Sequence, residues 1–360
     1  MIRLTWRQFR AQAAVGLGAL VAVAIISALT GPHLAHLYNT AVASCGAHGD
    51  CPAVTTAFLS NDSSLRSGLG ILVLVVPGII GIFWGAPLVA REIEAGTIAL
   101  AWTQSVTRTR WLAVKLVVIG LASMAVAGLL SLAVSWWGSP LDRVSMSQFG
   151  SFDQRDIVPI GYAAFAFALG VTAGVLIRRT LPAMAATLVA LVTVRLAVTS
   201  WIRPLLIVPL HRDLALSPVS TGYGSSGSGL TFFAMLFGGG PQATLQPSPP
   251  SIPDAWIYST RIVDKAGHAL TSRVLNSDCP GLAAGRPGPA GGHARAHVSA
   301  GAQQGLQDCV AKVGATYREV VTYQPASRYW AFQWYELAIF LGGALILGGF
   351  ALWWVRRRPA

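Results

Sequence analysis

Six long apolar stretches, separated by shorter polar segments, run along this chain of 360 residues. They cover about residues 13–31, 68–90, 112–137, 158–177, 182–202 and 331–354. Each is long enough to cross about 30 Å of hydrocarbon as a helix, and transmembrane helices tolerate the Gly, Ser, Thr and Pro residues within them. The pattern predicts an all-α integral membrane protein with six transmembrane helices and both ends on one side.

The overall composition agrees with this class of protein. Hydrophobic residues make up 53% of the chain, charged residues only 11%, and the mean hydropathy is +0.56. Soluble domains typically carry about 25% charged residues. The abundance of arginine over lysine, with many alanines, glycines and prolines, is typical of GC-rich genomes and suggests an actinobacterial origin.

The distribution of basic residues predicts the orientation. With a cytoplasmic N-terminus, the inner segments hold many basic residues and only two acids, Glu92 and Glu94. The basic residues are Arg3, Arg7, Arg10, Arg91, Arg108, Arg110, Lys115, Arg178, Arg179, Arg356, Arg357 and Arg358. This positive-inside pattern predicts a multi-pass plasma-membrane protein with both termini in the cytoplasm. The net charge of +12 then reflects attraction to anionic lipid, and nucleic acid is not an expected partner.

The first residues predict a separate short helix. In a helix over residues 1–12, Ile2, Trp6 and Phe9 share one face and three arginines share another. We expect this amphipathic helix to lie at the inner membrane interface, although a plain basic flank of the first span is the alternative. A signal peptide is disfavoured because the cleavage-like sequence before Cys45 lies too far beyond the apolar run.

A large outer region separates the fifth and sixth spans. The predicted parts are residues 1–202 with five spans, residues 203–329 as an extracellular insertion, and residues 330–360 with the sixth span and a cytoplasmic tail. Many Gly, Pro and Ser residues predict loops and short elements in the insertion. Residues 300–322 are compatible with a helix.

All four cysteines fall on the predicted outer side, where the environment is oxidising. They are Cys45, Cys51, Cys279 and Cys309. An even number in this compartment suggests disulfides, and we favour the local pairs Cys45–Cys51 and Cys279–Cys309. Unpaired thiols are the alternative.

The sequence contains no recognisable catalytic constellation. There is no phosphate-binding Gly-x-x-x-x-Gly-Lys-Ser/Thr loop, no His-Glu-x-x-His and no Cys-x-x-Cys. The histidines that could bind a metal are His33, His36, His48, His293 and His297, but surface histidines in polar loops explain them better. We therefore expect neither an enzyme nor a directly bound metal or cofactor.

Two charged residues lie within predicted spans. Arg195 is in the fifth span and Glu336 in the sixth, and both fall in the outer half of the membrane. Charges in hydrocarbon usually face a partner or water. The sequence favours equally an ion pair between these residues and an Arg195 side chain that extends to the outer surface.

The polar segment between the second and third spans has the most distinctive pattern. It begins with Arg91-Glu92-Ile93-Glu94-Ala95-Gly96-Thr97 and continues to Thr107-Arg108-Thr109-Arg110-Trp111. Such a compact patterned run between apolar spans suggests a docking segment, whereas simple solvation of a loop is the alternative.

Residues 90–100, followed by the basic return at 107–115, resemble the segment after the second helix in ABC-2-type exporter permeases. The six spans, the N-terminal helix, the cytoplasmic termini and the large outer insertion agree with that family. Phe83-Trp84-Gly85-Ala86-Pro87 and residues 323–330 also resemble an actinobacterial branch of it.

The resemblance implies a dimer of permeases that docks on ABC ATPase subunits, which bind ATP and Mg²⁺ and are separate chains. Glu92 and Glu94 would contact basic residues of the ATPase, and Gly96-Thr97 would end the second helix. Ile98, Leu100 and Trp102 would supply apolar contacts, with Arg91, Arg108 and Arg110 as the flanking basic residues, the last two at lipid headgroups. The segment 91–111 would thus act as a coupling helix.

A non-transporting membrane sensor or scaffold is the competing prediction. The size of the outer region, residues 203–329, would suit the binding of a ligand or an envelope partner. Neither the substrate nor the transport direction follows from the sequence.

Overall fold

A computed structural model describes most of the six predicted spans and several elements of residues 203–329. The described residues are 2–42, 54, 57–60, 63–95, 107–142, 148–215, 230–235, 242–247, 252, 254–271, 308 and 312–357. They form two compact units, Met1–Val208 with Ser327–Ala360, and Pro209–Ala326.

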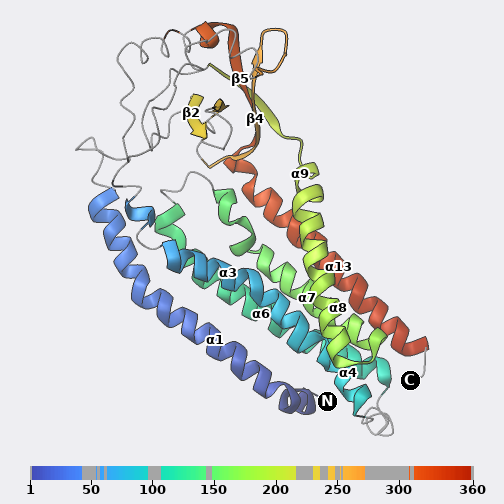
Figure 1. Ribbon diagram of the computed structural model, residues 1–360. Helices are drawn as coiled ribbons and strands as arrows, with labels where there is room; N and C mark the ends of the chain where they lie inside the picture. The colour runs from blue at the N-terminus through green and yellow to red at the C-terminus, as the bar shows by residue number, and fades with distance from the viewer. Residues whose placement is uncertain are drawn as a thin grey trace, which may run out of the picture. The chain divides into compact units, whose positions relative to one another are not determined.

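The first unit is a bundle of long helices (Figure 1). Its α-helices are α1 (Ile2–Leu37), α3 (Ser63–Ile80), α4 (Pro87–Glu94), α6 (Arg108–Asp142), α7 (Val158–Ile177), α8 (Thr180–Ala197), α9 (Arg203–Leu205) and α13 (Tyr329–Arg357). The π-helical turns η1 (Tyr38–Val42), η3 (Gly81–Gly85) and η5 (Val198–Ile202) extend or join them. The 3₁₀ segments η4 (Gln148–Gln154) and η6 (Ala326–Arg328) precede α7 and α13.

Six helical stretches in the described residues are long and apolar enough to cross a membrane, which confirms the predicted number. They are Gln12–Thr40, Ser63–Glu94, Thr109–Asp142, Gln148–Ile177, Thr180–Leu205 and Ala326–Arg357. Each reaches beyond its apolar window, because helical hydrogen bonding continues through flanking polar residues where the chain allows it.

The N-terminal residues do not form a separate element. Helix α1 begins at Ile2 and includes Pro32 before it ends at Leu37. The predicted interfacial helix over residues 1–12 is therefore part of the first long helix, as in the alternative of a basic flank. Gln12 fixes α1 to the second span, since its side-chain amide donates a 3.0 Å hydrogen bond to the Phe83 carbonyl.

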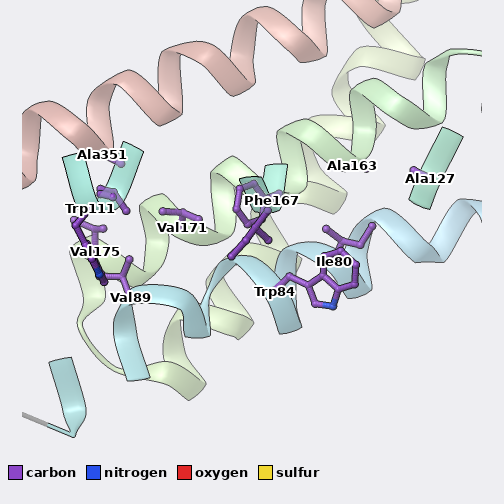
Figure 2. Packing of buried hydrophobic residues seen from close by; sticks show 12 residues of the cluster. Ile80, Trp84, Val89, Trp111, Ala127, Ala163, Phe167, Val171, Val175 and Ala351 are labelled. Carbon is purple, nitrogen blue, oxygen red and sulfur yellow. The ribbon is translucent and has the colours of Figure 1, made fainter. Parts of the chain in front are cut away.

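Helix α7 is the centre of the bundle and packs against α3, α6, α8 and α13. The apolar residues that surround it form one cluster. Figure 2 shows members of this cluster from the second span, α6, α7 and α13: Ile80, Trp84, Val89, Trp111, Ala127, Ala163, Phe167, Val171, Val175 and Ala351. Burial of these side chains against one another joins the spans into one unit.

Glycines let the second span touch α7 backbone to backbone. A Cβ added to Gly170 would lie 2.2 Å from the carbonyl oxygen of Gly81, and one added to Gly174 would lie 2.5 Å from that of Ala86. Gly85 is equally restricted, because its Cβ would lie 2.6 Å from the Phe167 carbonyl oxygen. Small residues spaced by four are the usual device for close packing of membrane helices. The junction of η3 and α4 is thereby pressed directly against α7.

The second unit contains β-structure, so the prediction of an entirely α-helical chain is wrong for this part. Strands β1 (Leu210–Ala215), β5 (Tyr317–Gln324) and β4 (Trp256–Asp264) form an antiparallel sheet in the order β1-β5-β4. A second antiparallel pair consists of β2 (Leu230–Met235) and β3 (Gln242–Pro247). A helix over residues 300–322, which the sequence allowed, does not extend past Thr316, because Tyr317–Gln324 is rich in β-branched and aromatic residues and pairs with two strands.

A buried acid occupies the middle strand of this sheet. Glu319 lies opposite Leu214 of β1 and Ile262 of β4 and is 1% exposed. Within the part of the chain that the structure describes, its Oε1 atom has no hydrogen-bond partner. Burial raises the pKa of the Glu319 carboxyl above its ordinary value.

Candidate functional site

The predicted docking segment begins where α4 ends. Helix α4 finishes at Glu94, and Ala95 caps it by donating to the Arg91 carbonyl. Residues 96–106 lie outside the described residues, as do the individual positions predicted to end the helix or dock: Gly96, Thr97, Ile98, Leu100 and Trp102. Their roles stay predictions. The described flanks, however, show how the segment is held.

Glu92 is paired within the chain. Its Oε1 atom lies 2.7 Å from Nζ of Lys115, whose side chain is only 4% exposed. The ammonium group also lies 4.2 Å from the centre of the Trp111 ring. Lys115 and Trp111 belong to the first turns of α6, so this ion pair fastens the last turn of α4 to the beginning of the third span.

Glu94 is bound to the turn between α7 and α8. Its carboxylate accepts a hydrogen bond of 3.0 Å from the Thr180 backbone N–H and another from the Thr180 hydroxyl. Thr180 begins α8, and the preceding Arg179 offers no side-chain cap. A carboxylate from another helix thus satisfies a free N–H at a helix N-terminus, where negative charge is favourable.

The two carboxylates therefore attach the start of the docking segment to α6 and α8. The sequence suggested that they contact basic residues of another protein, and that contact stays a prediction. Both acids already have partners within the chain, Lys115 for Glu92 and Thr180 for Glu94. Exposed basic residues also lie at this end of the bundle: Arg91 and Arg110 on the flanks of the segment, and Arg178 and Arg179 in the turn between α7 and α8.

A buried charge network lies at the end of the bundle opposite α4, near α9 (Figure 1). We define the Arg203 network as Arg203, Glu336, Asp153 and Tyr162. The guanidinium forks onto Glu336, with Nε–Oε2 of 2.7 Å and Nη2–Oε1 of 2.8 Å, and its Nη2 also pairs with Asp153. The Tyr162 hydroxyl lies 2.9 Å from Asp153 and also contacts Glu336. The network joins α9, α13, α7 and η4.

The predicted ion pair between Arg195 and Glu336 is wrong. Glu336 is paired with Arg203, which lies eight residues further along and presents two N–H groups in a planar fork. Arg195 instead donates to the carbonyl of Leu74 at 2.9 Å and lies 4.0 Å from the centre of the Tyr162 ring. It does not extend to the surface as the alternative had suggested.

Sequence reasoning missed Arg203 because the arginine, followed by Pro204, marked the end of the fifth span. The helix in fact continues through η5 into α9. A signal was present: eight residues are about two helical turns, so Arg195 and Arg203 fall on one face of a helix.

Residues before α7 connect the network to its surroundings. Arg155 pairs with Asp142 at the end of α6, and Asp156 accepts a 2.6 Å hydrogen bond from the Tyr329 hydroxyl. Gln333 of α13 accepts from the Val158 N–H and donates to the Phe152 carbonyl. The segment between α6 and α7 is thus bonded to the end of α6 and to the first turns of α13.

The helices from α3 to α8 lie in a region that matches a known protein family. Residues 17–203, just over half of the chain, match the family described as ABC-2 membrane transporter related. The chain belongs to this family. The ABC-2 resemblance is thereby confirmed, whereas the actinobacterial branch stays a prediction. No curated protein and no solved structure matches the sequence significantly.

The matched region of this ABC-2 family member includes α3, α4, α6, α7 and α8, and it ends at Arg203. The family is the membrane component of an ABC transporter rather than its ATPase, and it implies an ABC ATPase as partner. Both fastened carboxylates of the docking segment fall within the match.

The remaining candidate residues of this ABC-2 family member give no site. His33 and His36 are exposed on α1, and His48, His293 and His297 lie outside the described residues. Across the described ranges, no group of three or more His, Cys, Asp or Glu side chains could hold a metal ion. The four cysteines also lie outside these ranges, so their pairing stays a prediction.

Proposed function

We propose that the chain is the permease subunit of an ATP-driven ABC exporter, coupled to a separate ATPase through residues 91–111. The observation that carries this proposal is that two carboxylates attach the end of α4 to two other spans. Glu92 binds the start of α6 and Glu94 binds the start of α8. A displacement of the docking segment would therefore pull on the third and fifth spans together.

The packing of the second span supports the same mechanism. Because η3 and α4 touch α7 through Gly81, Gly85, Gly170 and Gly174, little side-chain material lies between them to absorb movement. Force applied at the docking segment would be passed to the central helix of the bundle.

The proposed orientation places this end of the bundle in the cytoplasm of a cell bounded by a plasma membrane. Arg178, Arg179, Arg356 and Arg357 are exposed, and the positive-inside rule assigns such clusters to the cytoplasmic side. ATP and Mg²⁺ would bind to the ATPase, and a second permease copy or a paralogue would complete the transporter within the lipid bilayer.

Co-expression with the ATPase encoded by a neighbouring gene tests the proposal. The two chains should co-purify, and vanadate-sensitive ATP hydrolysis should require both. Thr180→Val should leave the complex intact but lower permease-dependent hydrolysis about threefold, because it removes the hydroxyl that donates to the Glu94 carboxylate. Thr193→Val is the control, since among the described residues that exposed hydroxyl bonds within its own helix, to the Val189 carbonyl.

Two results would contradict the proposal. Failure of any ATPase to bind would favour a sensor or scaffold whose insertion binds a partner. Normal hydrolysis in Thr180→Val would show that the contact with Glu94 carries no force.

A further inference from the structure

The second span is irregular at three points along its length. It contains Pro77 within α3, the π-helical turn Gly81–Gly85, and Pro87 at the start of α4. Pro77 has no N–H to donate, and its ring crowds the carbonyl of Val73, four residues earlier. Prolines and π-helical turns are the usual bending points of helices. This span also leads directly into the proposed docking segment.

Arg195 binds the turn of α3 that precedes Pro77. Its Nη1 donates a 2.9 Å hydrogen bond to the carbonyl oxygen of Leu74. The other surface of the guanidinium lies 4.0 Å from the centre of the Tyr162 ring. One side chain from α8 thus connects α3, beside its proline, with α7.

The charge of Arg195 is unexpected for a purely structural contact. A cation within a membrane span is costly, and intramembrane charges usually mark function. Among the described residues its polar contacts are a carbonyl oxygen and an aromatic face, neither of which carries a full negative charge. A guanidinium is nevertheless suited to this place, because its planar group can stack on a ring while an edge N–H donates.

We infer that Arg195 is a positioning residue that fixes the conformation of the second span around Pro77. The inference rests on the proposed function, in which this conformation changes when the ATPase moves the docking segment. Tyr162 extends the effect, because its hydroxyl belongs to the Arg203 network while its ring supports Arg195. Through Arg195 and Tyr162, movement of the second span would therefore reach the Arg203 network.

Hydrogen–deuterium exchange of the full-length chain in lipid nanodiscs tests this. Arg195→Met should exchange about tenfold faster in peptides covering residues 71–80, equivalent to about 1.4 kcal/mol. Arg195→Lys should give an intermediate rate, since an ammonium cannot both stack and donate along the same plane. Thr193→Val in the same helix is the control and should match the wild type.

A further variant separates the two roles of Tyr162. Tyr162→Phe keeps the ring beneath Arg195 but removes the hydroxyl from the network. It should leave exchange at residues 71–80 near the wild-type rate and raise it in η4. Wild-type exchange at residues 71–80 in Arg195→Met overturns the inference. Should that variant not fold, wild-type exchange in Arg195→Lys does the same.

The complex with the ATPase provides the functional measurement. ATP with vanadate should change exchange at residues 71–80 in the wild type, whereas Arg195→Met should bind the ATPase equally and lose that nucleotide-dependent change. An equal change in both proteins overturns the inference. Failure of the wild type to bind any ATPase overturns the proposed function instead. The exchange of the isolated chain then still decides whether Arg195 fixes the second span around Pro77.

Discussion

Neutralising Glu336 should destabilise the bundle strongly. Glu336 is fully buried and forms the fork with Arg203, whose side chain is 6% exposed. Glu336→Gln keeps the side-chain volume but leaves this guanidinium with Asp153 as its remaining carboxylate contact in the described residues. Removal of one partner from a buried ion pair costs about 3–5 kcal/mol, and the contact with Asp153 places the expected loss near the lower limit.

The assay is unfolding in mixed micelles at increasing SDS fraction, followed by tryptophan fluorescence. Arg203→Met should also destabilise the chain, since it leaves Glu336 buried without its cation. The loss of unfolding free energy in the double variant should be smaller than the sum of the two single losses. The difference should be at least about 1.5 kcal/mol, because the groups that are removed bind each other. Leu345→Ala, at a side chain that is 77% exposed, is the control for a lipid-facing site.

An additive double variant would refute this reasoning. So would a Glu336→Gln protein as stable as the Leu345→Ala control. A parallel cycle with Arg195→Met should give a smaller coupling energy to Glu336 than Arg203 does, because Arg195 reaches the network only through the Tyr162 ring.

Two further predictions concern other parts of the chain. Gly170→Ala should destabilise the bundle by about 2 kcal/mol or more in the same SDS assay, since the new Cβ would overlap the Gly81 carbonyl oxygen at 2.2 Å, whereas Gly342→Ala has nothing within 4 Å and should be neutral. The buried carboxyl of Glu319, whose pKa is raised, should make the sheet of the second unit most stable below the ordinary value of 4.5 and less stable as pH rises through the raised pKa. Glu319→Gln should remove this pH dependence of exchange in β5.

The controls for these two predictions are internal. Equal stability of the Gly170→Ala and Gly342→Ala proteins would show that α7 and the second span can separate without cost. A Glu319→Gln protein whose β5 exchange still accelerates between acidic and neutral pH would show that another group titrates.

The spans were predictable because burial in lipid selects long apolar runs, whatever packs against them. Their ends were not. Helix α1 continues through Pro32 to Leu37, because a proline costs little when its neighbours can re-satisfy the free carbonyl. Likewise, a hydropathy window ends a span at Arg203, although a charge with a buried partner does not need to leave the membrane.

The candidate site was predictable in position but not in its contacts. The pattern of Glu92 and Glu94 identified the end of the second span, yet their partners, Lys115 and Thr180, depend on how α6 and α8 pack against it. Similarly, the choice between Arg195 and Arg203 for Glu336 is one of three-dimensional geometry. The strand β5 was missed because helix and strand patterns are hard to separate in short segments.

The burial of α7 limits how copies of this chain can assemble. Of the apolar window of Gln148–Ile177, 78% is buried by the chain itself, against 11% for Gln12–Thr40 and 11% for Ala326–Arg357. The fourth span therefore has little surface left for lipid or for a second subunit. In a permease dimer, the subunit interface and any transport pathway along it would have to be built from the other spans, and α7 would act as the fixed axis around which those spans rearrange.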